Sequence, residues 1–179
     1  MANHKEIIPF IKKWEGGYVN DPLDKGGETQ QGITYNTWKS VFGGNDHPRF
    51  IKMAEDDWAL IYQKLFWNAI QGDKINSQRI ANLLADWAWG SGDFWPKKRT
   101  QTVLNNLGFK LKTDSIFGNG TLSAINTADE PKLYDAIIAE RWAWLEQIYK
   151  AHPEQKRFEK GWANRLNNLI QFNLKNKIA

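Results

Sequence analysis

The chain has 179 residues, with 24 Lys and Arg against 20 Asp and Glu, a formal net charge of +4, and no cysteine. This length favours one compact domain, or one domain with a small appendage. The absence of cysteine excludes disulfide frameworks, thiolate catalysis and Cys-ligated metal centres. The mild positive charge suits an acidic polymer such as cell wall or nucleic acid, and it equally suits a protein whose charge only keeps it in solution.

The first 34 residues contain one helix and a turn-rich segment. Apolar positions recur at intervals of three and four, which predicts a helix face; they are Ile7, Phe10, Ile11, Trp14 and Tyr18. Gly16 and Gly17 end this helix. Residues 20–34 contain many turn formers, so we expect a tight loop or a small β-hairpin there.

The remainder of the chain is predicted to be a succession of helices. Their starts are at about Glu55, Ser77, Pro96, Thr121, Pro131 and Phe158, with stops at Gly90-Ser91-Gly92, Gly108 and His152-Pro153. No segment with the period of a strand exceeds about four residues, so the predicted fold is mainly α. A boundary near residues 90–95 divides the chain into regions 1–90 and 91–179, which we expect to pack as one compact unit.

Glu15 is the first candidate for chemistry, because it lies at the end of the first predicted helix on the row of Ile8 and Ile11. Partial desolvation beside an apolar face and the partial negative charge of the last helical carbonyls both disfavour an ionised carboxylate. Both therefore favour a carboxyl group that keeps its proton near neutral pH. General-acid cleavage of a glycosidic bond requires such a group.

This reaction also requires a second carboxylate, or a positioned water, on the far side of the sugar. Asp21 and Asp24 follow Glu15 by six and nine residues, and Thr29 follows it by fourteen. If the loop doubles back as a hairpin, one Asp could face Glu15 and Thr29 could position water. The alternative is structural: a solvated acid at a helix end, with Asp21 and Asp24 as turn residues.

Residues 14–34 read WEGGYVNDPLDKGGETQQGIT, and this segment closely resembles the opening signature of glycoside hydrolase family 108. The family comprises bacterial and phage-derived peptidoglycan muramidases, once described as secretion activator proteins. The resemblance implies a lysozyme-like helical fold with Glu15 as the catalytic acid. The order Glu15, Asp24, Thr29 is also similar to that of phage-type lysozymes, which makes Asp24 and Thr29 supporting candidates beside Asp21.

The resemblance covers most of the chain. Residues 62–67, 86–88 and 158–165 look like later landmarks of the family. From about residue 90 the family has a predicted peptidoglycan-binding region, and residues 114–121 are similar to its Asp-Gly-Ile-x-Gly-x-x-Thr pattern. This sequence departs from the family pattern at three places. Ser115 occupies a position where Gly is usual, Gln30-Gln31 precedes Gly32 in place of a pair that contains Asn, and residues 89–92 lack an expected Asn.

Ten tryptophans exceed the needs of a core of this size, and flat aromatic faces bind pyranose rings. Trp89 and Trp95 flank the predicted loop near residue 92, so we expect both to contact sugar. Tyr18 and Gln31 of the signature are further candidates for substrate binding. Five tryptophans on apolar helix faces are expected in the core: Trp14, Trp58, Trp87, Trp142 and Trp162.

Other chemistries find little support. The three histidines are far apart and form no metal-binding pair at helical spacing, so neither a metal nor another cofactor is expected. Lys97-Lys98-Arg99 before a helix leaves a nucleic-acid module as an alternative. No nucleic-acid signature accompanies these residues, so nucleic acid is not an expected partner.

The sequence therefore predicts a peptidoglycan hydrolase that cleaves the β-1,4 bond between N-acetylmuramic acid and N-acetylglucosamine, with Glu15 as general acid. Two alternatives stay open: a lytic transglycosylase that uses the same acid, and a catalytically silent peptidoglycan-binding or secretion-assisting protein. The sequence has neither a signal-peptide pattern nor an apolar run of about 18 residues. We therefore expect a protein made in the cytoplasm without stable membrane insertion, which reaches the wall through a holin or an export route. We also expect a monomer.

Overall fold

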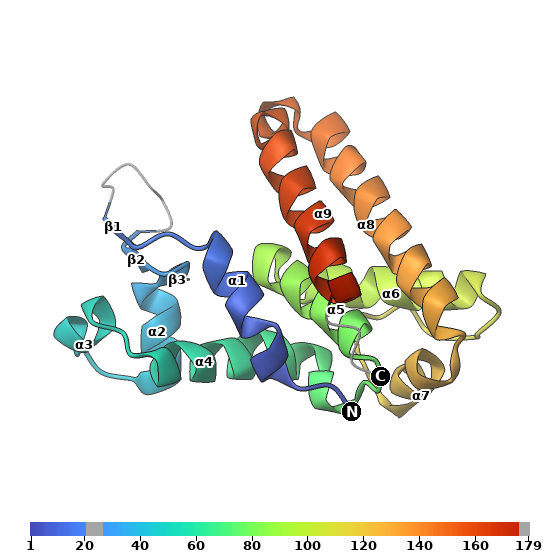
Figure 1. The fold of residues 1–179 in the computed structure, drawn as a ribbon, viewed down its shortest axis with the longest axis horizontal. Coiled ribbons are helices and arrows are strands. Elements are labelled where there is room, and N and C mark those ends of the chain that lie inside the picture. The colour runs from blue at the N-terminus through green and yellow to red at the C-terminus, as the bar shows by residue number, and fades with distance from the viewer. Residues whose placement is uncertain (21–26, 176–179) are drawn as a thin grey trace. The chain divides into compact units, whose positions relative to one another are not determined.

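The computed structural model describes residues 1–20 and 27–175, which form two compact units. The smaller unit comprises residues 5–65, and the larger unit comprises residues 1–4 and the residues from 66 onward. In Figure 1 the smaller unit runs from blue to green and the larger unit continues from green to red. Along the chain, the smaller unit is therefore an insertion near the start of the larger one.

The first residues are packed into the larger unit. The backbone N–H of Ala2 donates to the carbonyl of Ile75 at 2.8 Å, and that of Asn3 donates to Gln78 Oε1 at 2.8 Å. The rings of His4 and Trp67 lie 6.2 Å apart. The two points at which the chain leaves and re-enters the larger unit are thus close together.

The smaller unit combines helices with a small antiparallel sheet. Its elements are α1 (Ile8–Trp14), β1 (Tyr18–Val19), β2 (Thr29–Gln30), β3 (Ile33–Thr34), α2 (Tyr35–Phe42), α3 (His47–Ile51) and α4 (Glu55–Tyr62). A 3-10 turn at His4–Glu6 precedes α1, and a π-helical stretch at Gln63–Trp67 follows α4. The predicted first helix and the helix at Glu55 are confirmed, whereas the sequence analysis missed α2 and α3.

A two-residue turn joins β2 to β3. Gln30 pairs with Ile33, so Gln31 and Gly32 form the turn, and both have positive φ angles of 48° and 78°. Two positive φ values are typical of a type I′ turn, whose twist matches that of the flanking strands. β1 pairs with β2 to complete the sheet, which confirms the small hairpin predicted after the first helix.

Aromatic packing and ion pairs hold the helices of the smaller unit together. Trp38, Phe50 and Trp58 are at most 1% exposed. Arg49 on α3 donates from Nε and Nη2 to the Asp57 carboxylate on α4, at 2.9 and 2.7 Å. The sheet is therefore attached to a packed helical support.

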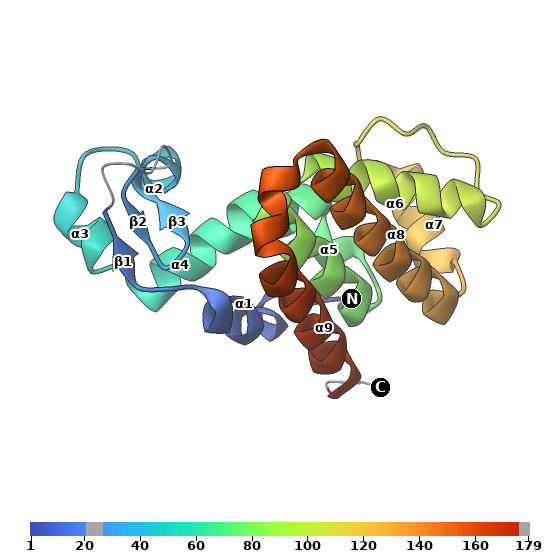
Figure 2. The same cartoon turned by 90° about the horizontal axis from the view of Figure 1, so that it is seen from above.

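In its described part the larger unit contains helices and connecting loops but no strand. Two 3-10 turns, η3 (Asn68–Ile70) and η4 (Gly72–Lys74), precede α5 (Gln78–Ser91), α6 (Phe94–Asn106), α7 (Asn119–Thr127), α8 (Glu130–Ala151), η5 (Pro153–Phe158) and α9 (Glu159–Lys175). Figure 2 shows α8 and α9 side by side, as Figure 1 does, with η5 joining them. The helices predicted for this half of the chain are confirmed.

α5 is the central helix of the larger unit, with residues 80–88 all buried. It packs against α6, α8 and α9. Ser77 caps its start by accepting a hydrogen bond from the N–H of Ile80 at 3.3 Å, and Gly92 ends it with a φ of 74°. A helix buried on all sides needs a partner for every polar side chain that it carries.

The buried polar group of α5 that matters most is Asp86, which is 0% exposed. Arg141 on α8 donates from Nη2 to its Oδ2 at 2.7 Å, and Arg165 on α9 donates from Nε to its Oδ1 at 3.0 Å. Burial lowers the pKa of Arg141, and the Asp86 carboxylate opposes this effect. One carboxylate therefore joins two later helices to the core helix.

Removing this carboxylate should be costly. We expect Asp86→Asn to lower the free energy of unfolding by about 3 kcal/mol, because the buried Arg141 and the half-buried Arg165 would lose their negative partner. Urea unfolding followed by tryptophan fluorescence measures the loss. Asp135→Asn, an exposed change on α8, is the matched control, and equal stability of the two variants would contradict the prediction.

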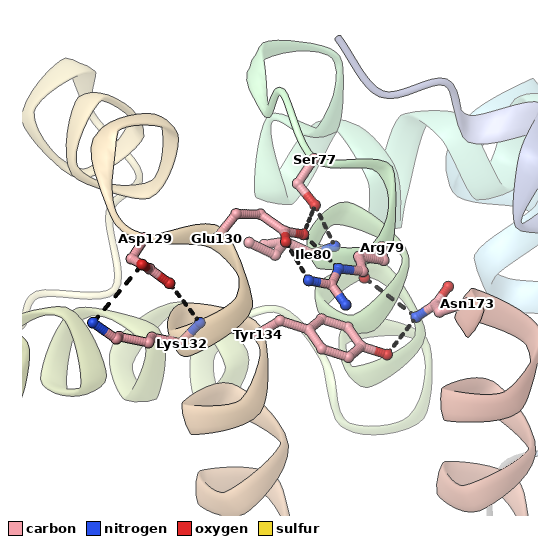
Figure 3. Close-up of polar contacts among 8 residues, drawn as sticks. All are labelled: Ser77, Arg79, Ile80, Asp129, Glu130, Lys132, Tyr134 and Asn173. Carbon is pink, nitrogen blue, oxygen red and sulfur yellow. Dashed lines mark hydrogen bonds and ion pairs between the residues drawn. The ribbon is translucent and has the colours of Figure 1, made fainter. Parts of the chain in front are cut away.

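A second polar cluster joins the first turns of α5 and α8 to α9 (Figure 3). Glu130 Oε1 accepts hydrogen bonds from Ser77 Oγ and Arg79 Nε, both at 2.6 Å. Asn173 Nδ2 donates to Tyr134 Oη at 3.0 Å and to the carbonyl of Arg79 at 3.3 Å. The Arg79 guanidinium also lies over the Tyr134 ring, 4.4 Å from its centre, so this cluster reinforces the same three-helix contact.

Gln101 on α6 organises the loop that leads to α7. Its Nε2 donates to Asp114 Oδ1 at 3.1 Å and to the carbonyl of Ile116 at 3.0 Å. Its Oε1 accepts from the N–H of Ser115 at 2.9 Å. Ser115 has a φ of 65°, and its buried hydroxyl has no hydrogen-bond partner among the described residues. A glycine would meet both conditions better than serine does at this position.

We therefore expect Ser115→Gly to raise the free energy of unfolding by about 1 kcal/mol. The change relieves the strain of a left-handed backbone and removes an unpaired buried hydroxyl. The greater conformational entropy of glycine in the unfolded chain offsets part of this gain. Urea unfolding measures the gain. Ser115→Ala removes only the hydroxyl and should gain less; an equal gain would show that the backbone is unstrained.

The mainly α fold predicted from the sequence is confirmed, with a three-stranded sheet as its β component. Across residues 1–20 and 27–175, no helix combines the length and the apolar character needed to cross a bilayer.

Candidate functional site

Glu15 follows α1 directly and caps it. Its backbone is extended, with φ −95° and ψ 138°, and its N–H donates to the carbonyl of Lys12 at 3.2 Å. The residue is half-buried. A Cβ atom at Gly16 or Gly17 would meet no described atom within 4 Å, so the backbone beside Glu15 is open to an approaching ligand.

The sheet brings two of the predicted site residues, Tyr18 and Thr29, onto neighbouring strands. Tyr18 lies opposite Gln30, and Val19 opposite Thr29. Tyr18 follows Glu15 by three residues and Thr29 follows it by fourteen. The Thr29 hydroxyl donates to the carbonyl of Gly27 at 3.2 Å. Asp21 and Asp24 lie outside the described residues.

Gln31 lies in the turn between β2 and β3. Its carbonyl accepts a hydrogen bond from Trp58 Nε1 at 3.0 Å, and the preceding Gln30 donates from Nε2 to the carbonyl of Ile51. These bonds fix the hairpin to α3 and α4. The backbone of Gln31 therefore has a structural role, and its half-buried side chain is at the end of the sheet.

Glu28, in the same sheet region, was not predicted from the sequence to have a role in the site. Its carboxylate accepts a hydrogen bond from the Tyr18 hydroxyl, and both of its oxygens lie 2.7 Å from His47 Nε2. Its carbonyl accepts from the N–H of Tyr35 at 2.9 Å. Glu28 thus ties β1 to α2 and α3, and nothing in the local sequence signals a pairing with a histidine 19 residues later.

The same contacts shift proton affinities. The hydrogen bond from Tyr18, with a further contribution from His47, lowers the pKa of Glu28. In return, the hydrogen bond to Glu28 raises the pKa of Tyr18. The Glu28 carboxylate is therefore held in its ionised form beside the candidate site.

This shift predicts a pH dependence of stability. Because the folded pKa of Glu28 lies below its unfolded value of about 4.3, its contribution is complete above that value and is lost as the pH falls through the folded pKa. We expect Glu28→Gln to melt at a lower temperature than the natural chain at about pH 7. The difference should disappear toward about pH 3. Thermal unfolding followed by circular dichroism measures both, and an unchanged difference at low pH would contradict the prediction.

The two predicted sugar-contact tryptophans belong to the larger unit. Trp89, near the end of α5, is half-buried, and its ring centre lies 4.7 Å from that of Phe66. Trp95, in the first turn of α6, is 39% exposed. Of the five tryptophans expected in the core, Trp58 and Trp87 are buried, whereas Trp14, Trp142 and Trp162 are half-buried.

The arrangement in the smaller unit suits acid chemistry on an extended ligand. A half-buried carboxyl group ends a helix and open backbone follows it. The sheet that begins three residues later carries a tyrosine and a threonine on neighbouring strands. In the part of the chain that the structure describes, no group of three or more His, Asp or Glu residues could hold a metal ion.

Comparisons with known proteins agree with this description. Residues 8–92 match the family model Glycosyl hydrolase 108, and residues 96–167 match that of a Predicted Peptidoglycan domain. Among curated proteins no relative matches the sequence. Among solved structures the chain is similar to SagA of Brucella abortus, with 25% identity and a TM-score of 0.79 over 98% of this chain and 96% of that chain. These matches confirm the family resemblance and the lysozyme-like fold.

Proposed function

Because residues 8–92 match the glycosyl hydrolase 108 model and residues 96–167 match a predicted peptidoglycan domain model, we propose that this lysozyme-like protein is an N-acetylmuramidase. It cleaves the β-1,4 bond between N-acetylmuramic acid and N-acetylglucosamine, with Glu15 as general acid. The observation that supports this best is the position of Glu15, half-buried at the end of α1 with open backbone after it.

In this mechanism Glu15 donates its proton to the glycosidic oxygen as the bond to the anomeric carbon breaks. A water molecule attacks that carbon from the other side, and Asp24 or Asp21 accepts its proton. Thr29 positions this water. The Thr29 hydroxyl already lies in the sheet that follows Glu15, where its hydrogen bond to the Gly27 carbonyl leaves its oxygen able to accept another.

In this proposal, two regions of the chain have different roles in catalysis and in binding of peptidoglycan. Residues 1–90 form the catalytic region, in which Tyr18 and Gln31 contact the sugar beside the cleaved bond. Residues 91–179 form the peptidoglycan-binding region. Trp89, at the end of the first region, and Trp95, at the start of the second, supply aromatic faces for sugar rings.

The proposal also includes how the protein reaches the cell wall. The protein acts as a monomer at the wall, in the periplasm or outside the cell, and it reaches the wall through a holin or a dedicated export route.

Glu15→Gln tests the catalytic assignment. We expect this change to preserve the fold, because the side-chain volume barely changes, and to lower the rate of lysis of purified peptidoglycan by about 100-fold or more. Turbidity loss and product mass measure the effect, with circular dichroism as the check on folding. Glu6→Gln, an exposed acid in the same segment, is the matched control and should retain activity.

The products decide between the related functions. Muropeptides with reducing ends that vanish in Glu15→Gln support the muramidase. Anhydro products would instead indicate lytic transglycosylation by the muramic 6-hydroxyl. Full activity in Glu15→Gln would overturn the role of Glu15, and sacculus binding without soluble products would favour a silent binding or secretion-assisting protein.

A further inference from the structure

Two large aromatic side chains are exposed next to each other at the start of α6. Phe94 is 49% and Trp95 is 39% exposed, and their ring centres lie 5.1 Å apart in a T-shaped arrangement. Both residues fall between the regions matched by the two family models, 8–92 and 96–167. They are therefore a feature of this chain that neither model describes.

Each ring is covered on one side by a cation one helical turn later. Lys98 Nζ lies 5.4 Å from the centre of the Phe94 ring, and Arg99 Cζ lies 5.5 Å from that of Trp95. Side chains on a helix lean toward its N-terminus, which brings residues four apart together.

The cation on Trp95 is itself fixed. Arg99 donates from Nη1 to Glu140 and from Nη2 to Gln147 Oε1, the latter at 2.6 Å, and both acceptors lie on α8. The indole is thus supported by a side chain that has its own partners. An exposed ring held in this way loses little conformational freedom when a ligand packs on it.

The charges in this turn are unequally compensated. Lys97 pairs with Asp93, and Arg99 pairs with Glu140. Among the described residues, no carboxylate forms an ion pair with Lys98. The surface made by Phe94, Trp95 and Lys98, here called the α6 platform, therefore offers two aromatic rings and one uncompensated ammonium group.

We propose that the α6 platform binds a sugar–peptide unit of peptidoglycan, with the rings against the sugar and Lys98 paired with a carboxylate of the stem peptide. The proposal rests on the peptidoglycan substrate of the proposed function and deepens it. The apolar C–H faces of a pyranose suit aromatic rings. A neutral glycan would leave the Lys98 charge unused, whereas stem peptides carry free carboxylates.

Binding to sacculi tests the α6 platform separately from cleavage. All variants are made in the Glu15→Gln background, so that no strand is cut, and they are sedimented with purified sacculi that are either intact or stripped of stem peptides by an amidase. We expect Phe94→Ala and Trp95→Ala each to weaken binding by about 10-fold on both preparations. Because both side chains are exposed, the fold should persist, and circular dichroism checks it.

Lys98→Gln gives an independent test of the charge. We expect it to weaken binding to intact sacculi by about 3-fold to 5-fold and to leave binding to stripped strands unchanged. The effect should shrink at about 0.5 M salt, because salt screens charges near the protein surface. Lys98 is half-buried; Lys110→Gln removes the same charge from an exposed position and is the charge control.

Several outcomes would overturn the proposal. The first is that the Glu15→Gln protein does not bind sacculi. The second is that Phe94→Ala and Trp95→Ala bind as tightly as the Glu15→Gln protein does. The third is that Lys98→Gln weakens binding equally on intact sacculi and on stripped strands. Self-association that Trp95→Ala abolishes would identify a second copy as the occupant. Single-stranded DNA that competes through the same residues would identify nucleic acid. If the natural protein releases no products although the ring variants still weaken binding, the muramidase fails and the α6 platform stands.

Discussion

The ion pairs between Asp86 and two arginines are the interaction on which the larger unit depends. A carboxylate in a fully buried helix is tolerable only because Arg141 and Arg165 compensate it. Glu140, the neighbour of Arg141 on α8, holds Arg99, and Arg99 in turn lies over Trp95. The buried pairs therefore set the position of α8, and α8 supports the exposed aromatic surface of α6.

The smaller unit achieves a comparable result by local means. Its sheet has strands of only two residues each, too short to be stable without support. Glu28 supplies part of that support through Tyr18 and His47, and the Gln31 carbonyl supplies more through Trp58. The strands next to Glu15 are thus held in place by side-chain contacts as much as by strand pairing.

The sequence predicted features that depend on neighbouring residues. Ser77 as a cap, Gly92 as a stop and the break at His152-Pro153 are local signals, and each marks an end of a helix in the structure. α2 and α3 escaped prediction because they have only eight and five residues, too few for a clear apolar period. The sequence signals that could have indicated these helices were the N-cap residues Thr34 and Asp46, whose side chains accept from the N–H groups of Thr37 and Arg49.

Long-range pairing could not be predicted in the same way. Asp86 meets partners 55 and 79 residues later, and Glu28 meets His47 across 19 residues. Nothing in the spacing of these residues selects one partner over another, because their contact follows from the packing of whole helices. For the candidate site, Tyr18 and Thr29 could be placed by the predicted hairpin, whereas the supporting role of Glu28 needed the structure.

The insertion of residues 5–65 into the larger unit has a consequence for the design of deletion variants. Residues 1–4 belong to the larger unit, and the His4 ring lies 6.2 Å from that of Trp67, so the two ends of the insertion almost meet. A short linker between residues 4 and 66 could bridge the cut without stretching either side. Joining residues 4 and 66 would thus keep Ala2 and Asn3 in the packing of the larger unit, whereas simple truncation from the N-terminus would remove them.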